Sequence, residues 1–597
     1  MPLNRREFIK AAGFSAAAAA YPSPLQVGAS GREAVRTLPY SAVQITGGPF
    51  ADQYNAIHAH YLSLSNDRLL KVYRQRAGLP APGEDMGGWY DLQGFVPGHS
   101  LGQYISGLSR IGSATGDRSC LEKAQTLVAG FAETLGPKNE SILRPQTNQW
   151  ICYTLDKHFI GLIDAASLAG DSSAVKVLDR VLQGAEPLLP PKVYDRIGKK
   201  YPPYDEPFVM PENLFLAAEL TGNPRFQQLA IRYLLDRDLF DPLAQGADPF
   251  PGQHAYSHVI ALSSAGQAYL RLGDGKYKEA MHNAFRLLTT TQQFASGGWG
   301  PNETFVTPGR GELFHSLTTT TDHFETPCGS YAATKLARYL LCASTPKSTE
   351  HADNLERVLF NTILVVRMPD SDGEYPYYST YSDTARKVFY PSKWPCCSGT
   401  LVQTVADYPL NIAFASDDGL YVVLYTPSQI RFARGAVAIQ IEQDTAFPVS
   451  DNASLKVSLN TPANFTLHLR LPAWLSRPAT IKINGRSIVP TGGSGSFESI
   501  RRTWHNGDRI DLTLPQDFRA EAIDDVNPNT VALMRGPVQY VAIEASNEPV
   551  NGRRLFPSSL KQIGQEVFVQ DKAGCHTVFV PLRSILNETY TSYFSKA

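Results

Sequence analysis

The stretch GHSLGQYISGLSRIGSATGD, residues 98–117, decides how the first two-thirds of the chain folds. Its apolar residues recur at helical spacing, and it ends on the dipeptide Gly116-Asp117. Glycine adopts the left-handed conformation that ends a helix, and Asp or Asn caps the start of the next one. The dipeptide therefore predicts a tight turn between two helices. The same signal recurs at intervals of 51 to 54 residues, at Gly170-Asp171, Gly222-Asn223 and Gly273-Asp274.

Apolar helical segments flank each of these dipeptides. FIGLIDAASLA precedes Gly170, for example, and AVKVLDRVL follows Asp171. Each repeat thus predicts two helices joined by the tight turn, with a long loop leading to the next repeat. Repeated α-hairpins of this kind stack into a solenoid or close into a ring. In a closed ring the long loops gather at one end and form a cup.

The second part of the chain has a different period. After about residue 415, apolar and polar residues alternate as in β-strands, for example in YVVLYTP, VAIQIEQ and TLHLRLPAW. Asn484-Gly485 and Asn506-Gly507 are hairpin signals. The sequence therefore predicts a multidomain α plus β protein: an export signal and linker at residues 1–30, a domain of helical repeats at 31–415, and a β-sandwich region of one or two units at 416–597.

Charge and the N-terminus restrict the location and the partners. Lys and Arg number 55 and Asp and Glu 56 among 597 residues, so no basic excess predicts nucleic-acid binding. In MPLNRREFIKAAGFSAAAAA, Arg5-Arg6 precede a short Ala-rich run, a pattern typical of twin-arginine export signals; a disordered tail or an uncleaved anchor is the alternative. No other stretch approaches the roughly 20 apolar residues of a transmembrane helix. We expect a periplasmic or extracellular protein without a transmembrane segment.

Two of the seven cysteines, Cys396 and Cys397, are adjacent in KWPCCSGT, residues 393–400. They could form a strained vicinal disulfide, be inert buried thiols, or bind a metal as thiolates. HFETPCGSY, residues 323–331, adds Glu325 and Cys328 about one helical turn apart. Three sulfurs and one carboxylate suit tetrahedral Zn²⁺. Spacing alone leaves the three interpretations open.

The order of several motifs resembles one known family. The stretches include GHSLGQYISGLSRIGSATGD, YTLDKHFIGLIDA, GQHAYSHV, GGWGPNETF, ETPCGSYAATKLARYL, HADNLERVLFNTIL and WPCCSGT, followed in the β region by LHLRLPAWL, IKINGRSI, TWHNGDRIDLTLP and ALMRGPVQY. From roughly residue 36 to beyond 540 the chain is similar to the bacterial β-L-arabinofuranosidases, glycoside hydrolase family 127 with its relatives in family 146. This resemblance implies an (α/α)6 barrel catalytic domain followed by β-sandwich domains, and an oligosaccharide or glycan substrate.

The resemblance also implies an unusual catalytic group. Cys396 would be the nucleophile of a retaining glycosidase that releases L-arabinofuranose from β-linked plant glycans. Its thiolate would be maintained by Zn²⁺, because a bound metal lowers the pKa of a thiol. The acid/base would be Glu303 in GGWGPNETF, with Glu312 and Asp322 as rivals. The zinc ligands would be Glu325, Cys328, Cys396 and Cys397.

Other polar residues in family-like contexts are expected to contact the sugar. They are His99, His158, His254 and Tyr378, and each has an ordinary structural role as its alternative. Trp89 and Trp299 are either sugar-stacking platforms or core residues, and Glu212 lies near the pocket or only begins a helix.

The chain departs from the family pattern in three places. Two residues separate Glu325 from Cys328 where relatives commonly have one, Gln103 stands where relatives often carry a second His, and Gln403 lacks an acidic residue often found nearby. Two other classes of protein remain as alternatives: a non-catalytic carbohydrate-binding protein with structural zinc, and an (α/α) barrel polysaccharide lyase.

Overall fold

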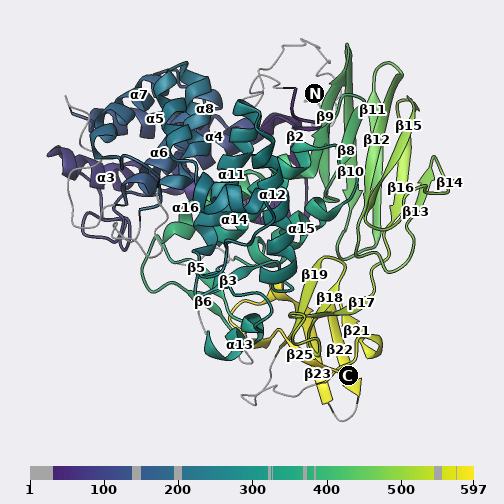
Figure 1. Ribbon diagram of the computed structural model, residues 1–597. Coiled ribbons are helices and arrows are strands. Elements are labelled where there is room, and N and C mark those ends of the chain that lie inside the picture. The colour runs from purple at the N-terminus through teal and green to yellow at the C-terminus, as the bar shows by residue number, and fades with distance from the viewer. Residues whose placement is uncertain are drawn as a thin grey trace, which may run out of the picture.

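The described part of the protein comprises a helical domain and three β-sheet layers beside and below it (Figure 1). A computed structural model describes residues 31–136, 150–193, 205–320, 324–325, 327–366, 373–381, 385–543, 554–572 and 575–597. The expected export signal at residues 1–30 and the acid/base rival Asp322 lie outside these ranges. For Glu325 and Tyr378 the description covers the backbone but not the side chain.

Six helices form a closed inner ring. Each contacts the next along the chain, and the last contacts the first. Their sides are almost entirely buried, because they face both the barrel interior and an outer layer of helices. The inner helices are α4 (Leu101–Thr115), α6 (Ile151–Ser167), α8 (Pro211–Thr221), α11 (Ala255–Leu272), α14 (Pro327–Ala343) and α16 (Cys396–Ala406).

Six outer helices cover this ring, each against one inner helix. They bury one stripe and expose the other, as amphipathic surface helices do. This arrangement confirms the predicted (α/α)6 barrel. The outer helices are α5 (Arg118–Glu133), α7 (Ser173–Ala185), α9 (Pro224–Arg232), α12 (Gly275–Leu287), α15 (Glu350–Val358) and α2 (Gly48–Ser63); α3 (Asn66–Ala77), α10 (Asp241–Ala244), α13 (Glu312–Thr319) and α17 (Tyr408–Ile412) lie beside them.

The Gly-Asp dipeptides form the tight turns that the sequence predicts. Gly116 ends α4 with a φ of 75°, and the Asp117 carboxylate accepts the backbone N–H of Ser119 at 2.9 Å. Equivalent caps join α8 to α9 and α11 to α12, and before α7 the Asp171 carboxylate accepts the backbone N–H of Ser173 at 3.0 Å. All these turns follow the C-terminal ends of inner helices, so the long connections and the N-terminal ends of the inner helices share the opposite end of the barrel.

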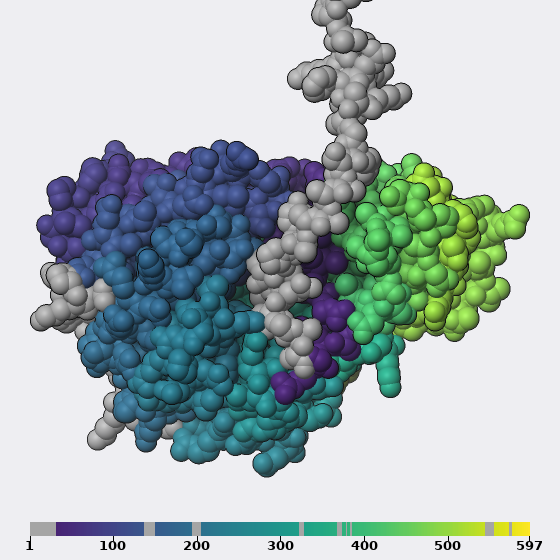
Figure 2. All heavy atoms as spheres, turned by 90° about the horizontal axis from the view of Figure 1, so that it is seen from above, coloured from purple at the N-terminus to yellow at the C-terminus, as the bar shows by residue number. Residues whose placement is uncertain are grey.

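A β-sandwich follows the barrel in sequence and lies beside it (Figures 1 and 2). Phe432 and Phe465 meet across its two sheets with ring centroids 5.4 Å apart. One sheet has the order β1 (Arg36–Thr37), β7 (Ala413–Ala415), β8 (Gly419–Val422), β12 (Ala463–Leu471) and β15 (Ser496–Trp504). The other has the order β14 (Arg486–Ile488), β13 (Thr480–Ile483), β16 (Arg509–Thr513), β11 (Asn452–Leu459), β10 (Val437–Thr445), β9 (Ser428–Arg434) and β2 (Val43–Ile45).

The sandwich also takes strands from the start of the described chain, because β1 pairs with β7 and β2 pairs with β9. The predicted boundary near residue 415 therefore separates two kinds of secondary structure but does not assign every strand to the C-terminal part. Inner and outer helices still come only from residues before 415.

The C-terminal part of the chain forms a third sheet. Its nine strands are β17 (Phe518–Ala522), β18 (Thr530–Arg535), β19 (Val538–Ile543), β20 (Arg554–Leu555), β21 (Lys561–Gly564), β22 (Val567–Lys572), β23 (Cys575–Pro581), β24 (Tyr590–Thr591) and β25 (Phe594–Lys596).

Buried ion pairs join the β layers to the outer helix α15. The guanidinium of Arg470, on β12, is fully buried and binds Asp353 at 2.7 Å as well as Glu356. The residue of α15 that follows Glu356, Arg357, pairs with Glu521 of β17. Buried charges in such contacts need their partners, so these pairs fix how the β layers sit on the barrel.

A small four-stranded sheet positions loop residues near the barrel end formed by the inner-helix N-termini. It has the order β3 (Trp299–Pro301), β4 (Phe324–Glu325), β5 (Pro376–Ser379) and β6 (Lys387–Phe389), and β3 and β4 contact α11 and α14. Among the described residues, no helix combines the length and the apolar character that a membrane span requires.

Candidate active site

Three cysteines converge at the N-terminal ends of two inner helices. Cys328 lies in the first turn of α14, and Cys396 and Cys397 begin α16. The Cys328 sulfur lies 3.4 Å from each of the other two, and those two sulfurs are 3.9 Å apart. These separations are far longer than the roughly 2.05 Å of a disulfide bond. The vicinal-disulfide interpretation therefore does not fit the structure.

The three sulfur atoms have the spacing of three corners of a zinc tetrahedron. A tetrahedral Zn–S length of about 2.3 Å places neighbouring sulfurs about 3.8 Å apart, close to the observed values. The fourth expected ligand, Glu325, has its backbone in β4, paired with Trp299 of β3 and Tyr378 of β5. The three described sulfur donors fit a thiolate-rich metal site.

The environment of the sulfurs distinguishes Cys396 from its neighbour. Burial favours the neutral thiol, but hydrogen bonds from Cys328, Cys397 and Tyr377 outweigh it and hold the pKa of Cys396 well below the usual thiol value. For Cys397, burial and the two neighbouring sulfurs raise the pKa instead. The start of α16 adds the positive end of the helix dipole. Of the two adjacent cysteines, Cys396 is therefore the one that more readily carries negative charge.

Tyr377 connects this sulfur to a carboxylate. The Tyr377 hydroxyl lies 3.1 Å from the Cys396 sulfur and 3.1 Å from Oε1 of Glu303. Sulfur and carboxylate oxygen are thus no farther apart than 6.2 Å, twice the length of either contact. The sequence analysis selected the neighbouring Tyr378, whose side chain lies outside the described part of the structure. Nothing in the sequence distinguished Tyr377 from it.

The backbone around Glu303 is shaped to present its side chain. Asn302 and Glu303 have φ values of 56° and 57°, a left-handed conformation uncommon outside glycine and often found at functional sites. The Glu303 carbonyl accepts the N–H of Ala255 at 2.9 Å, and Thr304 bridges to His254. This pairing holds the loop against the start of α11.

His254 lies next to Glu303, as the sequence analysis expected for a site residue. Its Nε2 is 4.0 Å from Oε2 of Glu303, and its Nδ1 is 2.9 Å from Oε1 of Glu206. Glu206 is almost completely buried, and as a carboxylate it accepts a hydrogen bond from the Nδ1–H of His254. His254 consequently turns Nε2 towards Glu303. Sequence analysis did not identify Glu206, whose position only the fold reveals.

His99 is also part of the site. Its Nδ1 donates to the Val96 carbonyl at 2.8 Å, and Nε2 has no hydrogen-bond partner among the described residues. Burial, reinforced by the nearby charge of Lys157, lowers the pKa of His99 to about 4. Its ring is therefore neutral near pH 7, with an acceptor nitrogen.

Lys157 is a buried cation close to the cysteines that sequence analysis missed. Its ammonium group lies 3.3 Å from the centre of the Tyr153 ring. Burial lowers its pKa, while the charges of Asp156, Cys328 and Cys396 act in the opposite direction. A lysine within a helix gives no sequence signal of this placement.

The structure does not bring His158 to the sulfurs. Its Nε2 is 2.8 Å from the Tyr73 hydroxyl, its Nδ1 donates to the Thr154 carbonyl, and its ring packs on Phe131 of outer helix α5. Both nitrogens are already used in packing α6 against the outer layer. We therefore leave His158 out of the proposed substrate contacts.

Other candidates also have structural roles. The Glu312 carboxylate accepts the N–H of Thr307 at 2.7 Å, which favours Glu303 over it as the residue beside Cys396. Glu212 pairs with Lys335 inside the barrel, and Trp299 is buried in β3. Trp89 is half-buried and makes edge-to-face contacts with Tyr390 and Phe95.

Two of the departures from the family pattern pair with each other. Gln103 of α4 donates from Nε2 to Oε1 of Gln403 of α16 at 2.8 Å, and Gln403 donates to Ser106 at 2.9 Å. A Cβ at Gly399 would lie only 1.9 Å from the Gln103 side-chain oxygen, so the close approach requires glycine there. These changes place two amide side chains in the barrel core, and Oε1 of Gln103 has no hydrogen-bond partner among the described residues.

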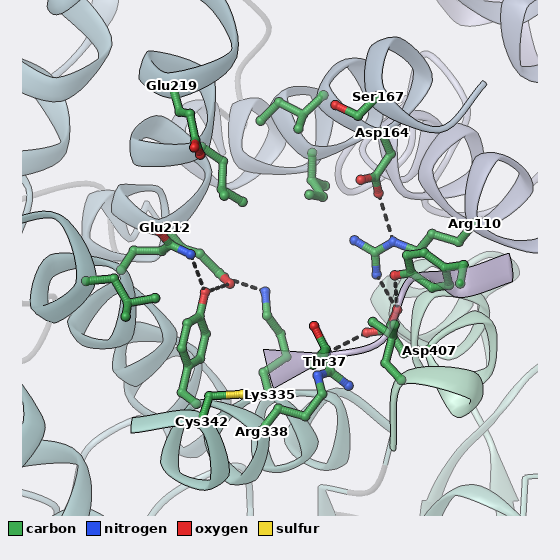
Figure 3. A pocket seen from close by; sticks show the side chains of 18 of the residues that line it. Thr37, Arg110, Asp164, Ser167, Glu212, Glu219, Lys335, Arg338, Cys342 and Asp407 are labelled. Atoms are coloured by element: carbon green, nitrogen blue, oxygen red, sulfur yellow. Dashed lines mark hydrogen bonds and ion pairs between the residues drawn. The ribbon is translucent and has the colours of Figure 1, made fainter. Parts of the chain in front are cut away.

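A cavity lies at the other end of the barrel (Figure 3). It has a volume of about 490 Å³, and its lining includes residues from the C-terminal halves of α4, α6, α11 and α14. Figure 3 shows three ion pairs in its lining: Arg110 with Asp164 at 2.8 Å, Arg110 with Asp407 at 3.0 Å, and Lys335 with Glu212. None of the three cysteines lines it.

Comparisons with known proteins agree with this architecture. The chain matches the family model of the β-L-arabinofuranosidase GH127 catalytic domain over residues 42–410 and that of the GH127 middle domain over residues 419–516. None of the curated proteins compared with the chain matches it.

Two solved structures share the fold. Ara127N-Se, a GH127 β-L-arabinofuranosidase from Geobacillus stearothermophilus T6, aligns with a TM-score of 0.72 and 18% identity over 93% of this chain and 100% of its own. The GH127 β-arabinofuranosidase BT3674 aligns with a TM-score of 0.72 and 17% identity over 95% and 98%. Because the catalytic-domain model alone spans more than half of the sequence, this chain belongs to the GH127 β-L-arabinofuranosidase family and is a glycoside hydrolase.

Proposed function

We propose that the protein is an exported retaining glycosidase that releases L-arabinofuranose from β-linked plant glycans, with Cys396 as nucleophile and Glu303 as acid/base. The observation that carries this proposal is the Tyr377 hydroxyl, 3.1 Å from both groups. Retaining glycosidases hold their two catalytic groups about 5–5.5 Å apart, and inverting ones about 6.5–9.5 Å. The upper limit of 6.2 Å between the Cys396 sulfur and the Glu303 oxygen lies below the inverting range.

Cys328, Cys396, Cys397 and Glu325 would hold the zinc ion. When bound, zinc would keep the sulfurs deprotonated at neutral pH. The chain's own contribution is to orient Cys396 with the start of α16 and to donate a hydrogen bond to it from Tyr377.

In the first step, the Cys396 sulfur attacks the anomeric carbon of the bound sugar. The bond from that carbon to the leaving oxygen breaks with its electron pair on the oxygen, which takes a proton from Glu303. The product is a covalent thioglycoside. His254 lies against Glu303, and Glu206 fixes the tautomer of His254, so Glu303 is held where it can donate.

In the second step, Glu303 acts as a base. It takes a proton from water while the water oxygen attacks the anomeric carbon, and the carbon–sulfur bond breaks with its electron pair on Cys396. Two inversions give net retention. His99, with its buried acceptor nitrogen, and His254 are the proposed sugar-hydroxyl contacts among the described side chains, and Tyr378 remains a candidate.

Substitution of Cys396 tests this function. We expect Cys396→Ala to lower kcat/KM on a chromogenic β-L-arabinofuranoside by roughly 10⁴-fold, because no other group can form the thioglycoside. Cys342→Ala is the matched control, since Cys342 is a buried cysteine lining the far cavity. Zinc content is measured on all three proteins. Full turnover by Cys396→Ala would exclude the nucleophile assignment.

Export rests on Arg5-Arg6 alone, and cell fractionation tests it. We expect the full chain in the periplasm or medium and the Arg5→Lys, Arg6→Lys double variant in the cytoplasm. Equal distribution of the two proteins would contradict the twin-arginine prediction.

A further inference from the structure

Four aromatic side chains form a continuous group on loops at the active-site end of the barrel. We call them the aromatic rim: Trp89, Phe95, Trp150 and Tyr390. The Trp89 ring lies 4.7 Å from Phe95 and 5.3 Å from Tyr390, and Phe95 lies 5.6 Å from Trp150, all measured between centroids. The rim thus joins the loop before α4, the start of α6 and the loop between β6 and α16.

The rim is continuous with the catalytic groups. Tyr390 packs on Tyr377 with ring centroids 4.7 Å apart, and the Tyr377 hydroxyl contacts both Cys396 and Glu303. On its other side, Trp89 lies 5.9 Å from the ring of His99. A series of rings therefore leads from the catalytic sulfur and carboxylate to the protein surface.

The rim is more exposed than the aromatic residues packed beneath it. Phe95 is 36% exposed, and Trp89, Trp150 and Tyr390 are half-buried. By contrast, Trp394 and Tyr104, which lie below the same loops, are less than 2% exposed. Large aromatic rings gain free energy from burial, so a group left partly in water beside a catalytic site indicates a ligand that covers it.

We propose that the aromatic rim binds the sugar ring that carries the leaving oxygen, on the far side of the scissile bond from Cys396. This inference rests on the proposed function. Cys396 engages the sugar that is released, so a second ring of the substrate must extend past Glu303, which protonates the bond between them. The rim begins at that point, because Tyr390 packs on the tyrosine that contacts Glu303. Aromatic faces cover the C–H faces of a sugar, and the indole N–H and phenol O–H can bond its hydroxyls.

The test compares substrates with and without a second ring. We expect Trp89→Ala to lower kcat/KM at least 10-fold for a β-L-arabinofuranosyl disaccharide and less than 3-fold for methyl β-L-arabinofuranoside. Trp89→Phe should keep most of the disaccharide activity. The matched control is Phe389→Ala, because Phe389 is an exposed aromatic residue adjacent in sequence to Tyr390. Equal losses on both substrates, or no loss on either, would overturn the proposal.

A second variant tests the rim in case Trp89→Ala does not fold. Phe95→Ala removes the most exposed member of the rim and should give the same substrate-dependent loss at a smaller magnitude. Calorimetry on Cys396→Ala separates this inference from the proposed function. If the wild type hydrolyses neither glycoside, the proposed function fails. The rim would still be supported if Cys396→Ala binds the disaccharide more tightly than L-arabinose and if adding Trp89→Ala removes this difference. Equal binding of both sugars would refute it.

Discussion

At one end of the barrel, the N-termini of the inner helices surround three sulfurs, a tyrosine hydroxyl and a carboxylate. At the other end, the C-terminal halves of inner helices surround a cavity of about 490 Å³ lined by paired charges (Figure 3). Both ends take side chains from α14 and α16, with Cys328 and Cys396 at one end and Lys335 and Asp407 at the other.

In our proposal, reactive geometry and not cavity size distinguishes the active site. Asp407 accepts from Arg110 and Arg338 and from the Tyr40 hydroxyl, and this set of contacts leaves it a structural carboxylate. Glu303 instead has a left-handed backbone conformation, and its side chain is one-third exposed. It lies beside His254 and beside Tyr377, whose hydroxyl also contacts the Cys396 sulfur. Helix dipoles reinforce the contrast, because helix N-termini favour anions such as a thiolate.

The comparison is tested most strongly by one carboxylate from each end. We expect Glu303→Gln to lower kcat/KM on glycosides with poor leaving groups by about 10²–10⁴-fold, since an amide cannot donate the proton. Glu212→Gln, in the far cavity, should change kcat/KM less than 3-fold per folded molecule. Similar losses in both variants would mean that the two ends do not differ in the proposed way.

The next largest effect is on stability. Lys335 is buried and pairs with Glu212, so Lys335→Met leaves that carboxylate without its cation and should cost about 3–5 kcal/mol in free energy of unfolding. The control is Lys276→Met, whose partly exposed pairs with Asp236 and Asp241 are worth about 0–1 kcal/mol. Denaturant unfolding measures both. A smaller loss for Lys335 than for Lys276 would refute the structural role of the far cavity.

Two tyrosines give a finer comparison, because the hydroxyl of each lies within hydrogen-bond distance of a glutamate at its own end of the barrel. Tyr377→Phe removes the hydroxyl that contacts Cys396 and Glu303 and should lower kcat about 10–100-fold. Tyr339→Phe removes the 2.8 Å bond to Glu212 and should leave kcat unchanged. Steady-state kinetics on one substrate decides between them. An unchanged kcat in Tyr377→Phe would contradict the role of the bridging hydroxyl.

The smallest effect concerns a residue at neither end. Burial lowers the folded-state pKa of His158 to about 4 from an ordinary value of 6.5. As the pH falls, the unfolded chain therefore binds a proton at His158 before the folded protein does. The contribution of the neutral ring to the free energy of unfolding is present above pH 6.5 and is lost as the pH falls towards 4. His158→Gln should reduce the loss of unfolding free energy between pH 7.5 and 5.5 by about 1 kcal/mol. An unchanged pH dependence would contradict this assignment.

Local sequence signals predicted much of the fold. Gly116 and the other capping glycines mark the turns correctly, because a left-handed cap depends on the residues of the turn itself. The closure of the ring and the pairing of β1 with β7 depend on contacts between distant parts of the chain, so no local pattern shows them. The same distinction applies to the site.

The grouping of Cys328 with Cys396 and Cys397 followed from residue types that share a chemistry, and the structure brings these sulfurs together. Glu206 and Tyr377 were missed, because a buried carboxylate and one of two adjacent tyrosines carry no distinguishing pattern. His158 lies in a motif that resembles the family, yet its ring packs on Phe131 of outer helix α5. Which side of α6 faces the outer layer depends on how the helix packs in the barrel, and the motif does not show it.

The central claim is that the Cys396 sulfur becomes bonded to the sugar. Mass spectrometry of Glu303→Gln, acid-quenched during reaction with an activated β-L-arabinofuranoside, tests it directly, since loss of the base slows release more than attack. We predict one pentosyl group on the peptide that contains Cys396, absent when Cys396→Ala is added. A pentosyl group on any other residue, or product formation with no labelled protein, would contradict the account.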